Sequence, residues 1–233
     1  MIATLINCAT VILGSLLGLF LHTRISDAFR SIVYTGAGLI SLVLGVKMSL
    51  EVQRIVYLAL ALILGGILGE WWNVEGGILR LGELLKKRFS RASSKDFSYG
   101  FLNASVIFCV GAMTLVGAFK AGAEGDYDLL LTKSVMDGFM AIMLTAAMGI
   151  GVAFSALTIL VYQGGITLLA NVLKPLVTPL VLSELTAAGG ALVVMIGINL
   201  LGLSKLKTAN FLPALLIILG LLALEPLLPF RLS

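Results

Sequence analysis

Two charged side chains in the middle of the chain have the types and the spacing needed for ion or proton chemistry. Lys133 and Asp137 are four residues apart, so on a helix they share one face and can pair. Asp137 is the only formally charged residue between Val135 and Leu173. One interpretation makes Asp137 a cation or proton site tuned by Lys133. The other makes the pair a salt bridge that anchors the start of a membrane span.

Further polar residues fall at or within apolar runs, where each must find a partner or face a water-filled cavity. If a helix opened at Gln163-Gly164-Gly165, the freed backbone carbonyls could coordinate Na⁺. The alternative is close helix packing there, with Gln163 bonded to a neighbour. Buried amides such as Asn7 usually only hold helices together, but several in one small bundle favour a polar pathway. The candidate solute- or ion-binding residues are Asn103, Ser105, Cys109, Lys133, Asp137, Gln163, Asn199 and Asn210.

Most hydrolytic and redox chemistry lacks the residues that it needs. His22 is the only histidine, which excludes an HExxH zinc site and a Ser-His-Asp triad, and neither a GxSxG motif nor a P-loop occurs. Cys8 and Cys109 lie in apolar runs and form no CxxC pair, so neither a disulfide framework nor a thiolate metal site is indicated. We therefore expect no enzymatic activity, no metal and no cofactor.

The composition is that of a membrane protein. Of 233 residues, 59% are hydrophobic and 12% are charged, whereas soluble domains carry about 25% charged residues; mean hydropathy is +1.09. The net charge of +4 does not indicate nucleic-acid binding, because the basic residues mostly lie in short loops between apolar runs, where membrane topology explains them. The expected partner is the lipid bilayer.

The apolar runs predict an all-α membrane bundle that forms a single domain over 1–233. Residues 135–173 are too long for one span, since a straight helix of that length would rise about 58 Å across a ~30 Å hydrocarbon core. The run must break near Gly149-Ile150-Gly151, giving a hairpin, or at Gln163-Gly164-Gly165, giving a re-entrant or discontinuous helix; we favour the hairpin. The eight spans expected are 2–21, 32–49, 55–72, 101–119, 136–153, 156–173, 185–203 and 210–228.

The segment 75–98 has apolar residues at helical spacing and a cluster of basic ones, which predicts an amphipathic helix at the membrane interface or a basic cytoplasmic connector. Placing it inside the cell puts ten of the 16 Lys and Arg residues on inner loops and six outside. That asymmetry predicts eight spans with both termini outside.

Two pairs of spans resemble each other. A shift of 152 residues aligns Gly38 with Gly190 and Gly45 with Gly197, and it also aligns two leucines of the following span. The loop within the first pair is expected outside and that within the second pair inside. The repeats would therefore be inverted, an arrangement common in secondary transporters.

Several blocks of the chain resemble the YqgA/YdfK family of bacterial inner-membrane proteins, a domain of unknown function. They are FLNASVIFCVGAMTLVGAF, TKSVMDGF, GIGVAFSA, YQGGITLLA and KTANFLPAL, together with GGILGEWWNVEGGILRLGELL and the opening Asn7, Gly14 and Gly18, so the resemblance covers nearly the whole chain. It implies a multi-pass protein of the bacterial inner membrane, loosely described as a possible sodium channel or pump and linked in one member to biofilm formation. It brings no catalytic residues.

The function most consistent with these observations is a transporter or channel for a small solute or a monovalent cation, with its site near mid-membrane. The alternative is a non-transporting membrane scaffold or a regulator of cell-envelope or biofilm behaviour. A homo-oligomer is a further possible partner arrangement. A polar cavity that meets Asp137 or Gln163 would favour transport, and complete internal pairing of the polar groups would favour the alternative.

Overall fold

The computed structural model describes residues 1–22, 27–89, 96–109, 112–173 and 178–225, and within them every regular element is a helix. The all-α prediction is confirmed. In chain order the elements are α1 (Ile2–His22), α2 (Asp27–Ser49), α3 (Ile55–Trp72), α4 (Val74–Phe89), α5 (Asp96–Cys109), α6 (Ala112–Ala123), α7 (Asp128–Met148), the 3-10 helix η1 (Ile150–Phe154), α8 (Ser155–Leu173), α9 (Pro179–Leu200), the 3-10 helix η2 (Thr208–Phe211) and α10 (Pro213–Leu224).

The helices make this a multi-pass membrane protein. Six described helices are long and apolar enough to cross a bilayer. The pair α5–α6, bent by 60°, makes a seventh if it forms one span, and a shorter apolar helical stretch covers Thr208–Leu224. Each of the eight predicted spans overlaps one of these elements. The fifth was placed too late, at 136–153, because the buried charges of α7 were taken to mark a membrane boundary when α7 starts at Asp128.

The long apolar run breaks where the hairpin was predicted. Gly149 adopts φ 81°, a left-handed conformation that favours glycine, and it ends α7 before η1 begins. The alternative break at Gln163-Gly164-Gly165 is wrong, because α8 continues through these residues as one helix. Its backbone carbonyls there stay within the helical hydrogen-bond ladder.

The basic segment predicted at 75–98 is helical over most of its length. Asn73, with φ 50°, ends α3, and α4 then runs to Phe89. Residues 90–95 lie outside the described part, and Asp96 already starts α5. The last three residues of the predicted segment, 96–98, therefore belong to α5 rather than to α4.

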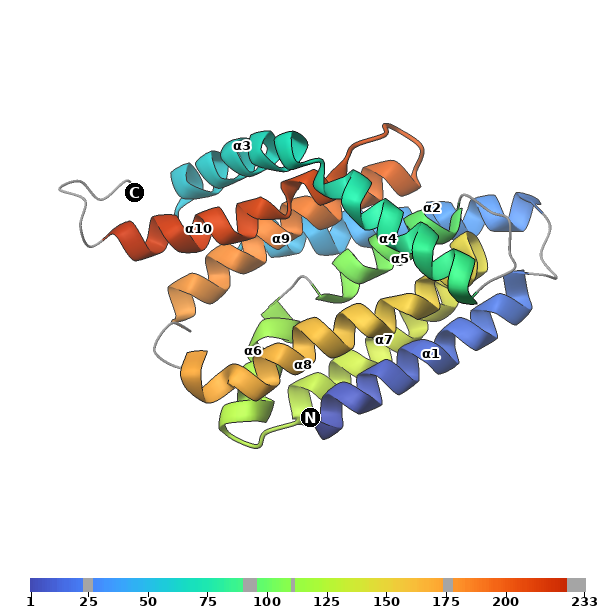
Figure 1. The fold of residues 1–233 in the computed structure, drawn as a ribbon, viewed down its shortest axis with the longest axis horizontal. Helices are drawn as coiled ribbons and strands as arrows, with labels where there is room; N and C mark the ends of the chain where they lie inside the picture. Colours follow the sequence, from blue (N-terminus) through green and yellow to red (C-terminus); the bar gives the residue numbers. More distant parts are fainter. Residues whose placement is uncertain (23–26, 90–95, 110–111, 174–177, 226–233) are drawn as a thin grey trace.

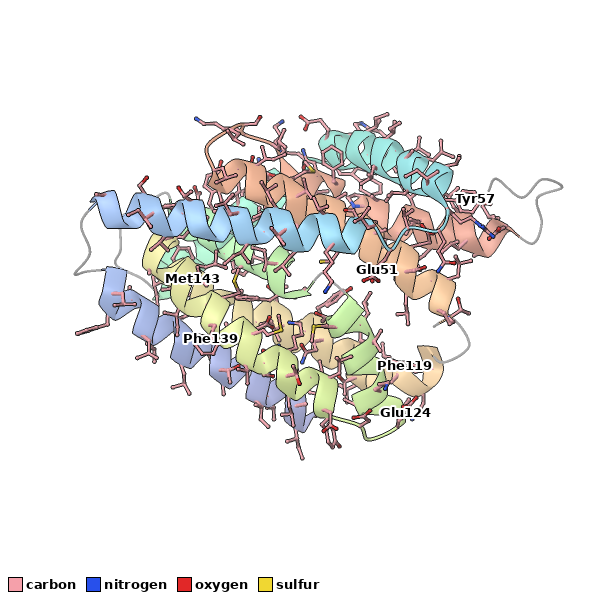
Figure 2. The ribbon with its side chains drawn as sticks, turned by 180° about the vertical axis from the view of Figure 1, so that it is seen from behind. Glu51, Tyr57, Phe119, Glu124, Phe139 and Met143 are labelled. Atoms are coloured by element: carbon pink, nitrogen blue, oxygen red, sulfur yellow. The ribbon has the colours of Figure 1, made fainter. Side chains whose placement is uncertain are left out.

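The helices form two groups that lie side by side (Figure 1). In Figure 1, α2, α3, α9 and α10 lie in the upper half and α1, α6, α7 and α8 in the lower half, with α4 and α5 near one end between them. The view from behind in Figure 2 shows the same division. The largest cluster of buried apolar residues contains side chains of both groups, among them Val11, Leu144 and Ile196.

Glycines set the closest helix contacts, because a missing side chain lets two backbones approach. Gly38 faces the carbonyl oxygen of Gly197, and Gly45 faces that of Gly190, so α2 and α9 run antiparallel. Gly65 and Gly69 of α3 face Ala214 and Asn210 in the same antiparallel sense.

Helix α1 lies against α7 in the parallel sense. Gly14 faces the carbonyl oxygen of Gly138 and Gly18 faces that of Ile142, so both chains advance in the same direction. These directions agree with eight alternating crossings. The contact also fixes the position of Asn7 on α1 relative to the charged residues of α7.

Candidate functional site

The Lys133–Asp137 ion pair lies inside the bundle. The Nζ of Lys133 donates to Oδ2 of Asp137 along α7, which confirms the pairing predicted from their spacing. Asp137 is nine residues into α7, about 13 Å along the helix axis. The two residues are 6% and 7% exposed, whereas Phe139, labelled in Figure 2, is 66% exposed. The pair is therefore buried among the helices of the bundle rather than on its surface.

Amides from two neighbouring helices complete the pair. The side-chain Nδ2 of Asn7 on α1 donates to Asp137 Oδ2 at 3.0 Å and to Gln163 Oε1 on α8 at 3.0 Å. Gln163 Nε2 donates to Thr4 Oγ1 at 3.2 Å, and the Thr167 hydroxyl lies 3.5 Å from that of Thr4. We call the set Thr4, Asn7, Lys133, Asp137, Gln163 and Thr167 the polar network.

One fully buried side-chain atom of the polar network has no hydrogen-bond partner among the described residues. Asn7 is fully buried, and its Oδ1 accepts no hydrogen bond. Turning the amide over would replace the Nδ2 donor, which already serves the oxygens of Asp137 and Gln163, so the assigned orientation is the favourable one. A buried amide oxygen without a donor costs about 1–3 kcal/mol. Asn7 Oδ1 can therefore accept a hydrogen bond from a donor that moves toward it.

Two further predicted residues, Ser105 and Cys109, lie on α5. Ser105 bonds to Thr158 on α8, with 2.9 Å between the hydroxyl oxygens. Cys109, the last residue of α5, belongs to the same buried cluster as Cys8 of α1. Beyond the bend, the Thr114 hydroxyl donates to the carbonyl oxygen of Phe108 at 3.1 Å, which satisfies one acceptor at the end of α5.

Asn103 lines a cavity of about 600 Å³ between α4, α5 and the segment after α9. The cavity is also lined by Tyr99, Glu75 and Lys205. Within the described part of the chain, Asn103 makes only a weak contact from Nδ2 to the Met148 sulfur at 3.9 Å, so its amide can still bind a solute. Neither Asp137 nor Gln163 lines this cavity.

Asn199 also lines the cavity, but its amide holds the chain in place. Its Oδ1 accepts the N–H of Leu206 at 2.7 Å, and its Nδ2 donates to the Leu206 carbonyl at 2.8 Å and to Thr208 Oγ1 at 3.3 Å. This reciprocal pairing fixes the turn between α9 and η2. The structure therefore separates Asn199 from the polar network.

The last predicted residue, Asn210, joins η2 to the corner between α3 and α4. Its Oδ1 accepts the N–H of Glu75 at 2.7 Å, and its Nδ2 donates to Glu70 Oε2 at 2.6 Å. Glu75 Oε2 accepts the N–H of Ala209 at 3.1 Å, and Lys207 pairs with Glu70. Burial raises the pKa of Glu75, an effect that the Ala209 N–H reduces. The Glu70 hydrogen bond raises the pKa of Lys207.

Comparison with known proteins agrees with these features. The model of a family described as "Protein of unknown function (DUF554)" matches residues 2–223. The chain belongs to this family. It is 32% identical over 221 residues to the uncharacterized membrane protein YdfK of Bacillus subtilis (strain 168), covering 93% of each chain. It is 28% identical over 226 residues to the uncharacterized protein YqgA of Escherichia coli (strain K12), covering 95% of this chain and 96% of YqgA. No solved structure matches.

In this DUF554 chain, sequence reasoning missed the buried carboxylate of α9. Glu184 of α9 is fully buried, and its Oε1 accepts the N–H groups of Gln53 at 2.8 Å and Arg54 at 2.6 Å. It thereby caps the start of α3, where a carboxylate is stabilised by the helix dipole. The sequence does indicate this residue, since Glu184 is the only acidic residue between residues 179 and 200.

Proposed function

We propose that this protein transports a small solute or a monovalent cation, with the polar network as its ion-binding centre. The observation that carries the proposal is the charged pair Lys133–Asp137, buried about 13 Å into α7 and joined to amides of α1 and α8. Charged side chains at that depth are costly, and those that persist mostly mark ion or substrate pathways. Packing alone would be served equally well by apolar residues.

The inverted repeat, which we propose extends over three helices, supports this function. Adding 152 to the bounds of α1, α2 and α3 gives 154–174, 179–201 and 207–224, against Ser155–Leu173, Pro179–Leu200 and Thr208–Leu224. The glycine contacts obey the same relation. Gly38 and Gly45 correspond to Gly190 and Gly197, and each touches the counterpart of the other, as two-fold symmetry requires.

In this arrangement the repeats would be α1–α3 and α8–α10. The polar network crosses between α1 and α8, the first helix of each repeat, through the Asn7–Gln163 and Thr4–Gln163 hydrogen bonds. Transporters with inverted repeats bind their ions at such an interface, near mid-membrane. The cavity at Asn103 would then be the vestibule, because α5 runs from there to Cys109 in the central buried cluster.

Ion and solute flux into proteoliposomes tests the proposal. Asp137→Asn keeps the side-chain shape and removes the charge, so we expect it to abolish flux while the protein still folds. Asp126→Asn is the matched control, since Asp126 also pairs with a lysine, Lys120 at 3.4 Å, but is half-exposed near the end of α6. Equal flux for wild type and Asp137→Asn would contradict the assignment.

A second candidate function is a membrane scaffold or envelope regulator without transport. It is favoured by the internal pairing of most polar groups in the network and by the absence of Asp137 and Gln163 from the cavity lining. Under this proposal no ion or solute would cross, and Lys133→Met combined with Asp137→Asn would restore the stability that either single change removes. In both cases we propose a non-enzymatic protein of the bacterial cytoplasmic membrane.

A further inference from the structure

The atoms around Asp137 suit a proton better than a sodium ion. A dehydrated Na⁺ takes several oxygen ligands, and broken helices supply them from freed carbonyls. Here α1, α7 and α8 all run unbroken past the polar network. The side-chain oxygens of Gln163 and Thr4 already accept hydrogen bonds, and Oδ2 of Asp137 accepts from both Lys133 and Asn7. A metal cation would have to displace all of these, whereas a proton needs only one carboxylate oxygen.

We propose that the ion handled at this site is H⁺, and that Asn7 Oδ1 receives the Lys133 ammonium when Asp137 is protonated. This inference rests on the proposed transport function and names its coupling ion. A proton passes from hydronium to a carboxylate oxygen of Asp137, which becomes a neutral carboxylic acid, and water is released. Lys133 keeps its three protons and exchanges one hydrogen-bond acceptor for another. The net charge of the pair changes from zero to +1.

The geometry places the Asn7 amide beside the Lys133 ammonium. Lys133 Nζ and Asn7 Nδ2 both donate to the same atom, Asp137 Oδ2, so the ammonium and the amide are neighbours. The amide oxygen is fully buried and unpartnered, as an acceptor held for a second state would be. Gln163 anchors the amide through Nδ2, which leaves Oδ1 in place while the lysine moves. An ammonium without such an acceptor would be stranded in a low-dielectric interior.

The other titratable groups around α7 do not offer an equivalent exchange. Cys109 of α5 and Cys8 of α1 lie in the central buried cluster, and Tyr162 of α8 packs against it. None of these is a carboxylate. At the ends of the packed helices, Lys120 of α6 pairs with Asp126, and Lys47 of α2 is exposed. Within the described residues, η1 carries no titratable side chain.

Infrared difference spectroscopy of the full-length protein in lipid tests the proposal directly. On lowering the pH, wild type and Asp126→Asn should gain the carbonyl band of a buried carboxylic acid, and this band should be missing from Asp137→Asn. Replacing Na⁺ with choline at fixed pH should leave the band and the thermal stability unchanged. A carboxylate that stays ionised throughout the stable pH range, or an Asp137-dependent stabilisation by Na⁺, would overturn the proton assignment.

A variant cycle tests the role of Asn7. In Lys133→Met, changing Asn7 to Leu removes only a donor to the carboxylate, which moves the protonation midpoint upward. With Lys133 present, the same change also removes the second acceptor, so the upward shift should be smaller or reversed. Equal shifts in both backgrounds would refute the exchange. Flux that depends on the Na⁺ gradient and not on pH would refute the proton assignment but not the transport function. No flux, together with an unchanged carboxylic acid band, would refute the transport function alone.

Discussion

The close contact between α1 and α7 at Gly14 should determine whether the Asn7–Asp137 hydrogen bond of the polar network can form. A Cβ added at Gly14 would overlap the carbonyl oxygen of Gly138, the residue that follows Asp137, and would lie 3.2 Å from the Cβ of Ala141. Carbon atoms pack best at about 3.5–4.0 Å, so Gly14→Ala must separate the helices by roughly 1 Å. The Asn7–Asp137 hydrogen bond would then lengthen from 3.0 Å to about 4 Å and be lost.

The cost follows from three effects. Overpacking costs about 1–3 kcal/mol, and losing one interhelical hydrogen bond costs about 0.6–2 kcal/mol. Replacing a helical glycine with alanine stabilises the helix by about 1 kcal/mol. The net loss should therefore be about 1–4 kcal/mol. Gly165→Ala in α8 is the matched control, because nothing lies within 4 Å of its added Cβ, and it should be neutral or up to about 1 kcal/mol more stable.

Reversible unfolding of the purified protein in mixed micelles measures this difference. Asn7→Leu should cost less in the Gly14→Ala background than in wild type, because the hydrogen bond that it removes is already broken. Gly14→Ala as stable as Gly165→Ala would show that α1 can rotate or shift without loss. Additive effects of Gly14→Ala and Asn7→Leu would show that the helix contact and the polar network are independent.

Three other predictions concern the helix ends. Burial raises the pKa of Glu75, so between the unfolded and the folded pKa the native state holds a proton that the unfolded state has released. The stability of the protein should therefore fall as the pH rises through this range. Glu75→Gln should remove this pH dependence, measured by thermal unfolding at a series of pH values. Asn199→Leu should cost roughly 2 kcal/mol, since it strands the N–H of Leu206, and a variant of wild-type stability would contradict the clamp. In a cysteine-free background, an impermeant thiol reagent outside the cell should label Leu50→Cys and spare Ser204→Cys; reversed labelling would overturn the orientation.

Much of the fold was determined by the sequence, because the bilayer leaves few options. Lipid offers no partner to a backbone N–H or C=O, so an apolar run of sufficient length must be a helix. The hairpin at Gly149 was predictable too, since the run exceeded the bilayer thickness and glycine tolerates the left-handed conformation found there. The Lys133–Asp137 pair followed from a four-residue spacing that depends only on helix geometry.

Tertiary packing decided the rest, because contacts between distant segments leave no mark on local spacing. Asn7 meets Gln163 across 156 residues, and this contact exists only because α1 and α8 pack together. Asn199 and Asn210 look like Asn103 in sequence, yet the amides of Asn199 and Asn210 hold backbone groups, whereas the Asn103 amide makes only a weak contact within the described residues and lines a cavity. Whether a buried amide holds the chain or serves a site depends on which partners surround it, and only the packed helices supply those partners.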